Sequence, residues 1–573
     1  AKLGQKLCSK KAGGRVPEYP RQELPDATKW DHTKWSPNYR NDNRIETHES
    51  GTAPCKTACP AHVAVQGYLK LAAQGRYDEA LALIKRENPL PAICGRVCNR
   101  RCEDACTRGR VDEAVAIDEV KKFIAQRDLD AATRYIPPVV TPTRAGGFDQ
   151  KIAIIGAGPA GLSCAFYLAE KGYKPVVFEK NERPGGMLTY GIPSFKLQKD
   201  VIEAEVEIIR LMGAEFRYGV EVGRDVTLDE LRAQGFKAFY VAIGCQGGRL
   251  AGIPGEDAED VTVAVDFLRE VNSGKIDALP GRTIVVGGGN VAIDVARNAC
   301  RLGSEHVEMF CLESEAQMPA SEEERREAVE DGAHISCGWG PKEVHLDEAG
   351  RVCGITFKRC TRVFDDEGRF APEYDENDLR RVDADRVVMS IGQSIVWGDL
   401  LAGSRVELGR GQGALADPQT YQTAEPDIFV GGDVYTGPSF AIDAIAAGHE
   451  AAVSIHRFVQ PGSTLTIGRN QRRYTALDRD DVVIEGYDNA SREVAHVDRE
   501  REKTAPFSEY VETFTEEQVR AETARCLGCG ASIVDPNKCI GCGLCTTKCA
   551  FDAIHLDRDR PECSTMVKYE QKL

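Results

Sequence analysis

The stretch that decides the fold is Lys151-Ile-Ala-Ile-Ile-Gly-Ala-Gly-Pro-Ala-Gly161. A short apolar strand, 151–155, runs directly into a G-x-G-x-x-G turn that opens a helix. The first glycine permits the tight turn, the second lets a pyrophosphate approach the backbone, and the third lets the helix pack on the strand. The helix N-terminus adds free N–H donors and partial positive charge. We therefore predict a dinucleotide site at this turn.

The strand that follows, 175–178, ends in Glu179, and a carboxylate at that place can accept hydrogen bonds from both hydroxyls of a ribose. A Gly185-Gly186 pair comes shortly after it. The residues predicted to bind the first dinucleotide are Gly156, Gly158, Pro159, Ala160, Gly161, Glu179, Lys180, Gly186 and Met187.

A second glycine loop lies farther along the chain. Strand 282–286 leads into Gly287-Gly-Gly-Asn-Val-Ala292 and an amphipathic helix to Leu302. Ala292 stands in place of the third glycine and is small enough for helix–strand contact. A following strand, 306–312, ends beside another carboxylate. The residues predicted to bind the second dinucleotide are Gly287, Gly289, Asn290, Val291 and Glu313.

A third motif identifies the first dinucleotide. Residues 427–434 form a strand that ends in Gly432-Asp433, and a helix is expected over Ser439–Arg457. With the first loop, this motif resembles the FAD domain of the two-dinucleotide-binding flavoproteins. The resemblance implies that Asp433 hydrogen-bonds the ribityl chain of FAD, and that the second loop belongs to an inserted NAD(P)H domain. The alternative is a strand-to-loop turn in which Asp433 is only a cap.

Many NADPH-using relatives carry consecutive arginines where this chain has Leu312 and Glu313. Arginine suits a 2′-phosphate because it makes paired, charged hydrogen bonds. A carboxylate repels the phosphate but suits two ribose hydroxyls. We therefore predict a preference for NAD(H) over NADP(H), unless Arg297, Arg325 or Arg326 folds back onto a phosphate.

Six cysteines gather in residues 51–135, which read as helical because apolar residues recur every three or four positions in Gln66–Ala73 and Asp78–Arg86. They are Cys55, Cys59, Cys94, Cys98, Cys102 and Cys106. Residues four apart share a helix face, so the last four could form a stripe of thiolates. Zinc is one candidate occupant, since four-cysteine zinc sites are common.

Seven more cysteines lie near the carboxyl end: Cys526, Cys529, Cys539, Cys542, Cys545, Cys549 and Cys563. The spacing 2-2-3 lets three neighbouring thiolates reach three irons of one cubane, with the fourth directed to another cluster. We predict a ferredoxin-like module with a 4Fe-4S cluster on Cys539, Cys542 and Cys545.

A second carboxyl-terminal cluster could use Cys526, Cys529 and Cys549, with Cys563 able to complete only one of the two. Seven thiolates are one short of the eight that two cubanes need. The remaining ligand could be another residue type, a hydroxide, or absent in a three-iron cluster. Structural zinc is the alternative for Cys526 and Cys529.

Residues 50–460 resemble the small subunit of glutamate synthase, the amino-terminal half of dihydropyrimidine dehydrogenase, and the large subunit of NADH-dependent ferredoxin:NADP oxidoreductase. The shared marks are Cys-Pro at 59–60, Gly95-Arg-Val-Cys98, Cys102-Glu-x2-Cys106, and the two glycine loops. The resemblance implies an FAD and iron–sulfur oxidoreductase.

The chain departs from this family at the amino-terminal cysteines and in its added carboxyl-terminal module. A further Cys-x2-Cys is usual upstream, but residues 44–51 contain none, so we expect one cluster here. The resemblance groups Cys59, Cys98 and Cys102, with the fourth ligand among the other three cysteines of the set. The family's Glu or Gln ligand aligns near Lys121, and lysine is a poor ligand, which favours an all-cysteine cluster.

Bulk properties exclude several functions. The chain has 573 residues and a formal net charge of -16, which argues against nonspecific binding to nucleic acid or anionic membrane. The sequence has no long apolar run for a membrane span and no apolar h-region at its start. We expect a cytoplasmic protein.

We predict an α/β two-dinucleotide-binding-domain flavoprotein with an N-terminal helical iron–sulfur domain and a C-terminal ferredoxin-like α+β module. The predicted segments are an extended arm (1–50), the helical iron–sulfur domain (51–145), the first part of the FAD domain (146–275), the NAD(P)H domain (276–390), the second part of the FAD domain (391–460), a linker (461–520) and the ferredoxin-like module (521–573).

The predicted function is electron transfer. A nicotinamide delivers two electrons as hydride, clusters carry one at a time, and a flavin can join the two. Hydride transfer requires no side-chain acid or base, so no catalytic residue is predicted. We expect ferredoxin or cluster-bearing partner subunits, in a transhydrogenase, bifurcating, hydrogenase or formate dehydrogenase type of complex. The alternatives are the electron-supplying subunit of glutamate synthase and a scaffold with vestigial nucleotide sites.

Overall fold

The computed structural model describes residues 51–139, 147–469, 474–480, 484, 487, 489–530, 540–543 and 545–546. The chain divides into two compact units, Ala1–Gly51 and Thr52–Leu573, and all elements below belong to the second. The extended arm predicted for residues 1–50 lies outside the described residues.

The first elements are short helices, as predicted. They are α2 (Pro54–Ala58), α3 (Val65–Ala73), α4 (Tyr77–Lys85), α5 (Pro91–Val97), α6 (Arg101–Asp104) and α7 (Ile117–Leu129), with a 3-10 turn at Thr107–Arg110. Proline opens α2 and α5, where its missing N–H has no partner to lose. The predicted helices at 66–73 and 78–86 are confirmed within one residue as α3 and α4.

A buried carboxylate joins these helices to the next domain. Glu205 on α10 (Lys199–Leu211) accepts hydrogen bonds from the N–H groups of Ala92 (2.8 Å) and Ile93 (3.0 Å) in the first turn of α5. Burial raises the pKa of Glu205 to about 8. The N-terminus of helix α5 is therefore held by the FAD-type domain.

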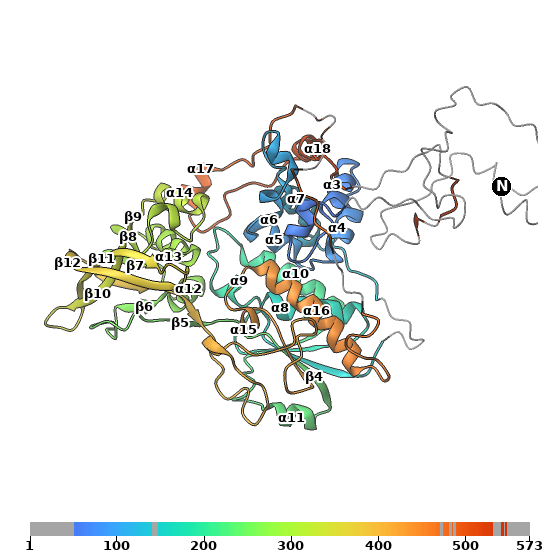
Figure 1. The fold of residues 1–573 in the computed structure, drawn as a ribbon, viewed down its shortest axis with the longest axis horizontal. Helices are drawn as coiled ribbons and strands as arrows, with labels where there is room; N and C mark the ends of the chain where they lie inside the picture. Colours follow the sequence, from blue (N-terminus) through green and yellow to red (C-terminus); the bar gives the residue numbers. More distant parts are fainter. Residues whose placement is uncertain are drawn as a thin grey trace, which may run out of the picture. The chain divides into compact units, whose positions relative to one another are not determined.

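The first parallel sheet has the order β15-β4-β1-β2-β3. Its strands are β1 (Lys151–Ile155), β2 (Val176–Glu179), β3 (Glu215–Tyr218), β4 (Phe236–Val241) and β15 (Ile428–Val430). The helices α8 (Pro159–Glu170) and α16 (Ala441–Val459) pack on each other, as Figure 1 shows. Three short helices complete the domain: α9 (Met187–Tyr190), α11 (Leu228–Ala233) and α15 (Asp433–Thr436).

The second parallel sheet has the order β6-β13-β7-β8-β9. Its strands are β6 (Val261–Val263), β7 (Arg282–Val286), β8 (His306–Cys311), β9 (His334–Cys337) and β13 (Arg386–Met389). The helices are α12 (Ala264–Asn272), α13 (Asn290–Arg301) and α14 (Glu322–Glu330). The strand β6 and helix α12 precede residue 276, where the sequence prediction began this domain.

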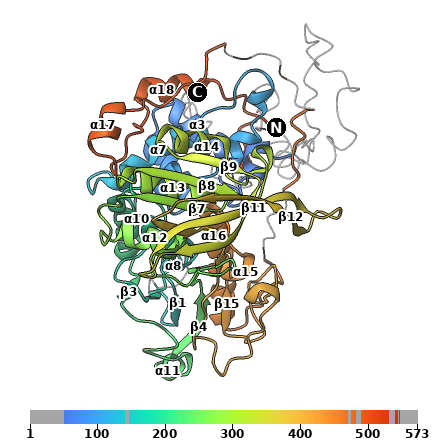
Figure 2. The same ribbon diagram turned by 90° about the vertical axis from the view of Figure 1, so that its left-hand side faces the viewer.

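A three-stranded antiparallel sheet is inserted in the second domain. The sequence analysis did not predict this sheet. It consists of β10 (Trp339–Leu346), β11 (Val352–Phe364) and β12 (Phe370–Val382) in that order. Figure 2 shows β11 and β12 running past the parallel strands. Phe310 of β8 stacks on Phe357 of β11 with ring centroids 3.9 Å apart, so the insertion extends the core of the second domain.

The two domains are joined by two chain crossings that pair with each other. The strand β5 (Gly247–Gly248) leaves the first domain and β14 (Gln393–Ser394) returns to it, and they form a two-stranded antiparallel ribbon. The second domain is thus an insertion between β4 and β15.

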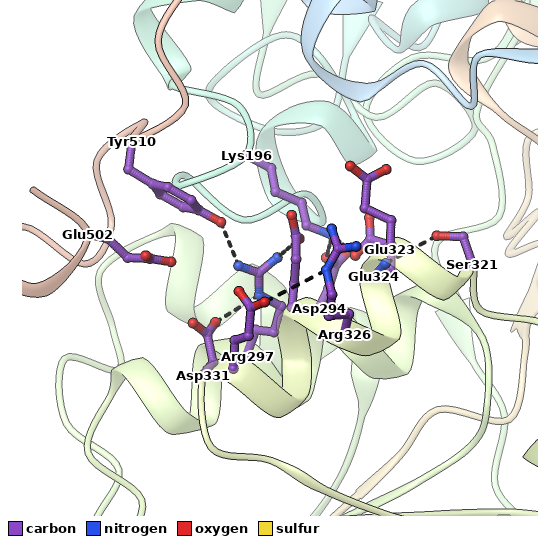
Figure 3. Close-up of polar contacts among 12 residues, drawn as sticks. Lys196, Asp294, Arg297, Ser321, Glu323, Glu324, Arg326, Asp331, Glu502 and Tyr510 are labelled. Carbon is purple, nitrogen blue, oxygen red and sulfur yellow. Dashed lines mark hydrogen bonds and ion pairs between the residues drawn. The ribbon is translucent and has the colours of Figure 1, made fainter. Parts of the chain in front are cut away.

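Residues 489–530, here called the carboxyl-terminal strap, contain α17 (Arg499–Thr504) and α18 (Glu516–Ala524). Most of this stretch falls in the predicted linker. Both ribbon views place α18 beside α3, on which it packs. Figure 3 shows Tyr510 of the strap facing Arg297 of α13, which donates to its hydroxyl at 2.7 Å.

Candidate functional site: two dinucleotide loops and two cysteine groups

The first glycine loop adopts the geometry that its sequence predicts. Gly156 has φ +104°, and a Cβ there would lie 2.5 Å from the Ala242 carbonyl oxygen. A Cβ on Gly161 would overlap the Gly156 carbonyl oxygen. Gly158, in contrast, has open space where its Cβ would lie, which leaves the backbone accessible to a phosphate.

Glu179 closes this loop from the neighbouring strand. Its Oε2 accepts a hydrogen bond from the Ala157 N–H at 2.8 Å, and its Oε1 accepts from the backbone (2.9 Å) and side chain (2.7 Å) of Asn181. Glu179 is buried, with 3% of the residue exposed. A buried carboxylate held beside the loop is the arrangement expected for a ribose-binding acid.

The second loop has the same framework. The Gly287 N–H donates to Phe310 O at 2.8 Å, just as the Gly156 N–H donates to Phe178 O at 2.8 Å. Gly289 faces open space, as Gly158 does. Glu313 lies over the loop, with its Oε2 3.0 Å from where a Cβ of Gly288 would be. Asn290 accepts a hydrogen bond from the Ser321 N–H at 3.1 Å.

One cavity joins the predicted residues of the first site to part of the second. Its lining includes the glycine loop, Glu179, Gly186, Met187, Gly432 and Asp433. Val291 and Asp294 of the second domain also line it, and Val97, next to Cys98, lines it from the amino-terminal helices. The sequence analysis gave neither residue a role in this site: Val97 was named only as part of the motif Gly95-Arg-Val-Cys98, and Asp294 belongs to no motif.

Asp433 lies in this cavity at the N-terminus of α15. Its Oδ1 accepts hydrogen bonds from the N–H (3.2 Å) and hydroxyl (3.3 Å) of Ser439. Burial raises the pKa of Asp433 to about 6, against the lowering effect of Ser439. Asp433 therefore lines the same cavity as the other residues predicted to bind the first dinucleotide.

The three arginines named as alternative phosphate ligands have other contacts. Arg297 is 1% exposed and pairs with Asp331 at 2.8 Å and with Glu327. Arg325 donates to Glu315 O at 2.7 Å, and Arg326 pairs with Glu330 at 3.7 Å. Arg325 thus contacts Glu315, two residues after Glu313.

The structure divides the amino-terminal cysteines into two groups. The helical cysteine group consists of Cys59, Cys98 and Cys102, in which Cys98 lies near both other thiols. Burial raises the pKa of Cys98 and of Cys102, while nearby Lys121 lowers both. This trio is the one that the family resemblance implies.

Lys121 occupies the position beside this group. It is 6% exposed and forms an ion pair with Asp118. Burial alone lowers the pKa of Lys121, but Asp118 and the thiols of Cys98 and Cys94 outweigh it and raise that pKa. Cys94 is fully buried and its Sγ lies 3.9 Å from Asn88 Oδ1. Cys94 and Lys121 both lie beside this group, and the structure assigns neither as its fourth ligand.

The shared cysteine group consists of Cys55, Cys106, Cys526 and Cys529. All four line one small cavity between the amino-terminal helices and the strap. Burial raises the pKa of Cys55, and the thiols of Cys526, Cys106 and Cys529 raise it further. Burial likewise raises the pKa of Cys526 to about 11. The sequence prediction instead joined Cys526 and Cys529 to Cys549, which lies outside the described residues.

The remaining predicted cluster ligands are only partly described. Cys542 is exposed and Cys545 is half-buried. Cys539, Cys549 and Cys563 lie outside the described residues. The geometry of the clusters predicted for the ferredoxin-like module therefore stays a prediction.

Comparison with known proteins agrees with this organisation. Residues 150–448 match the model of the pyridine nucleotide-disulphide oxidoreductases. Residues 46–133 match dihydropyrimidine dehydrogenase domain II with its 4Fe-4S cluster, and residues 532–555 match a 4Fe-4S binding domain.

Three relatives are similar over most of the chain. The β subunit of NADP(+)-dependent formate dehydrogenase from Moorella thermoacetica is 35% identical over 83% of this chain and 70% of its own. The small chain of glutamate synthase [NADPH] from Escherichia coli is 35% identical over 72% and 89%. The β subunit of NADPH-Fe(3+) oxidoreductase from Geobacter sulfurreducens is 32% identical over 83% and 75%.

The two glycine loops, the common cavity and the cysteine domains define a flavin-dependent oxidoreductase with iron–sulfur clusters. The chain belongs to the pyridine nucleotide-disulphide oxidoreductase family, and within it resembles the small subunit of glutamate synthase, as its cysteine and glycine motifs indicated. Among the described residues, no helix is both long and apolar enough to cross a membrane.

Proposed function

We propose that this chain is the subunit that passes electrons between a pyridine nucleotide and iron–sulfur acceptors, through FAD, in a multi-subunit cytoplasmic complex. The acceptors would be a ferredoxin or clusters of partner subunits. The complex would be of the transhydrogenase, bifurcating, hydrogenase or formate dehydrogenase type. The flux could also run in the opposite direction.

The observation that carries this proposal is the common cavity. It extends from Glu179, the predicted ribose ligand, to Val97, whose neighbour Cys98 belongs to the helical cysteine group. It is also lined by Val291 and Asp294, from the helix that follows the second glycine loop. A cofactor in this cavity would thus meet a nucleotide on one side and a cluster-binding segment on another.

The residues of the cavity fit FAD by the chemistry of their donors. Gly158 leaves its backbone open to a pyrophosphate, Glu179 offers a buried carboxylate to a ribose, and Asp433 offers a second carboxylate in the same cavity. Bound FAD supplies the exchange between two-electron and one-electron transfer. The protein holds and orients it, and α5, fixed by Glu205, sets the position of Val97.

We also propose that NAD(H) is preferred, because Glu313 takes the place over the second loop that Glu179 takes over the first. A carboxylate there disfavours a 2′-phosphate. Arg297, with its guanidinium paired to Asp331, does not counter it. The three relatives above carry NADP or NADPH in their names, so this chain would differ from them in nucleotide choice.

Anaerobic reduction tests the main proposal. Purified protein with bound flavin should bleach on addition of NADH, first at the flavin and then at the cluster absorption, and should reduce ferredoxin. Protein that retains FAD and iron yet stays oxidised with both NADH and NADPH would contradict the proposal. The ratio of kcat/KM for NADH and NADPH tests the nucleotide preference separately.

The second candidate function is electron supply to a glutamate synthase, favoured by the similarity to its small chain. Identification of the proteins that co-purify with the native complex distinguishes the two. A glutamine-dependent synthase subunit would support this alternative, whereas a cluster- or metal-bearing redox subunit would support the first.

A further inference from the structure

The cavity of the shared cysteine group is built from the two ends of the described chain. Cys55 and Cys106 come from the amino-terminal helices, and Cys526 and Cys529 come from the strap after α18. We propose that these four cysteines bind one 4Fe-4S cluster, distinct from that of the helical cysteine group and from those of the ferredoxin-like module. The inference deepens the proposed function, but its test is separate from that function.

The donor set fits a cubane by number and by spread. A 4Fe-4S cluster takes four cysteine thiolates, one for each iron. A zinc ion would draw its four sulfurs to within about 2.3 Å of one point. Among the described residues, no three His, Cys, Asp or Glu side chains are arranged to hold a single metal ion. The four cysteines instead line one cavity, as ligands of a larger group do.

An unpartnered hydroxyl provides a second, independent observation. Thr107 lines the same cavity, is 2% exposed, and among the described residues its Oγ1 has no hydrogen-bond partner. A buried polar group without a partner costs about 1–3 kcal/mol. A cluster in the cavity would provide sulfur acceptors for this hydroxyl.

The strap is fixed to the amino-terminal helices immediately around its two cysteines. Arg525, fully buried, pairs with Asp112 of the amino-terminal segment at 2.9 Å and, within the strap, with Glu522 at 2.7 Å. Glu522 also accepts from the Ala116 N–H at 2.7 Å.

Two more contacts hold the loop itself. Arg108 donates to Arg525 O at 3.3 Å, and the Gln66 side-chain amide donates to Cys529 O. A loop with ionic anchors at its start and a polar contact at its end is positioned before any cluster binds.

The assignment also changes the count of ligands. With Cys526 and Cys529 placed at the shared group, five cysteines remain in the ferredoxin-like module, enough for one cubane without a missing ligand. The upstream Cys-x2-Cys that residues 44–51 lack is replaced by one from the opposite end of the chain.

Serine variants of the anaerobically reconstituted full chain test this site. Cys526→Ser and Cys55→Ser should each lose about four irons per chain and the same electron paramagnetic resonance signal. The double variant should lose no more iron than either single variant, because both remove one cluster. Cys545→Ser should remove a different signal, and Cys300→Ser, outside every cysteine group, should lose none.

Additive iron loss in the double variant would overturn the proposal, because it would place the two cysteines on different clusters. Unchanged iron in Cys526→Ser, or stoichiometric zinc in the wild-type protein, would also overturn it. FAD content and NADH-dependent flavin bleaching should persist in Cys526→Ser. If bleaching fails in the wild-type protein as well, the proposed function fails while the cluster assignment stands on its iron count.

Thr107 offers a test that does not depend on cluster loss. Thr107→Val, nearly isosteric, should keep all iron but make the midpoint potential of this one cluster more negative, because it removes a donor to the reduced cluster. Thr107→Ser should restore the wild-type potential. A Thr107→Val protein with every cluster potential unchanged would contradict the placement of the cluster against this hydroxyl.

Discussion

In the first glycine loop, Gly161 faces the Gly156 carbonyl across a gap too narrow for a methyl group, whereas the second loop holds the methyl of Ala292 at the same helical position. The first glycine of each loop also differs in backbone angle, with φ +104° at Gly156 and +142° at Gly287. The two loops share a hydrogen-bond framework, but only the second has room for a methyl group at the third position of the motif.

The two predicted ribose-binding acids also differ, and again the one at the first loop is held more closely. Glu179 is buried and bonded to the Ala157 N–H, whereas Glu313 is only half-buried. We infer that the first loop is built tightly around a resident cofactor, and that the second leaves room for a nucleotide that enters and leaves in each turnover. Four predictions test this contrast.

The largest effect is expected at the third position of the motif. Gly161→Ala should lose most bound FAD, because the added methyl overlaps the Gly156 oxygen, and overpacking costs about 1–3 kcal/mol, or roughly 5–150-fold in affinity. Flavin absorbance after purification measures this. The matched change Ala292→Gly should keep FAD and lower stability by about 1 kcal/mol. Equal flavin loss in both variants would contradict the difference between the loops.

The next largest effect is expected at the two predicted ribose-binding acids, whose variants should affect different cofactors. Glu179→Ala leaves the buried Ala157 N–H without its acceptor, which costs about 1–3 kcal/mol. The dissociation constant of FAD, followed by flavin fluorescence, should rise accordingly. Glu313→Ala should keep FAD and instead raise KM for NADH. Flavin loss in Glu313→Ala would indicate that the second loop supports the first cofactor.

Nucleotide choice should respond to charge at residue 313. Glu313→Arg removes a repelling carboxylate and adds a phosphate ligand, and a charged hydrogen bond is worth about 1.5–3 kcal/mol. The NADPH to NADH ratio of kcat/KM should rise by roughly 10–100-fold. Glu315→Arg, two residues away, is the control and should change this ratio little. A ratio that does not rise in Glu313→Arg would remove Glu313 from nucleotide selection.

The smallest effect is a pH dependence of FAD binding. Since burial raises the pKa of Asp433 to about 6, the carboxylate is ionised above pH 6 and protonated below it. The ionised form is the better acceptor for a ribityl hydroxyl, so FAD should bind more tightly as pH rises through 6. One hydrogen bond of about 1 kcal/mol corresponds to roughly fivefold. Asp433→Asn should flatten this profile, and an unchanged profile would assign it to another group.

Local motifs made both loops predictable. Each strand, turn and helix, such as 151–170 and 282–301, is contiguous, so the pattern of apolar residues and glycines predicts it directly. The inserted sheet of β10–β12 was missed because its strands are partly exposed and lie inside a chain that otherwise alternates strands and helices. Val97 was missed for another reason, since its importance comes only from what the cavity brings beside it.

The sequence by itself determined the chemistry of this protein: two glycine loops for dinucleotides, an acid at the end of each second strand, and cysteines spaced for clusters. Those features depend on neighbours along the chain. The tertiary structure decided which cysteines meet, because Cys526 and Cys529 line one cavity with Cys55 and Cys106 although the whole flavoprotein core lies between them in sequence. Contacts between distant parts of the chain, such as the Arg525–Asp112 pair at 2.9 Å, then fix that approach, and no spacing rule can predict them.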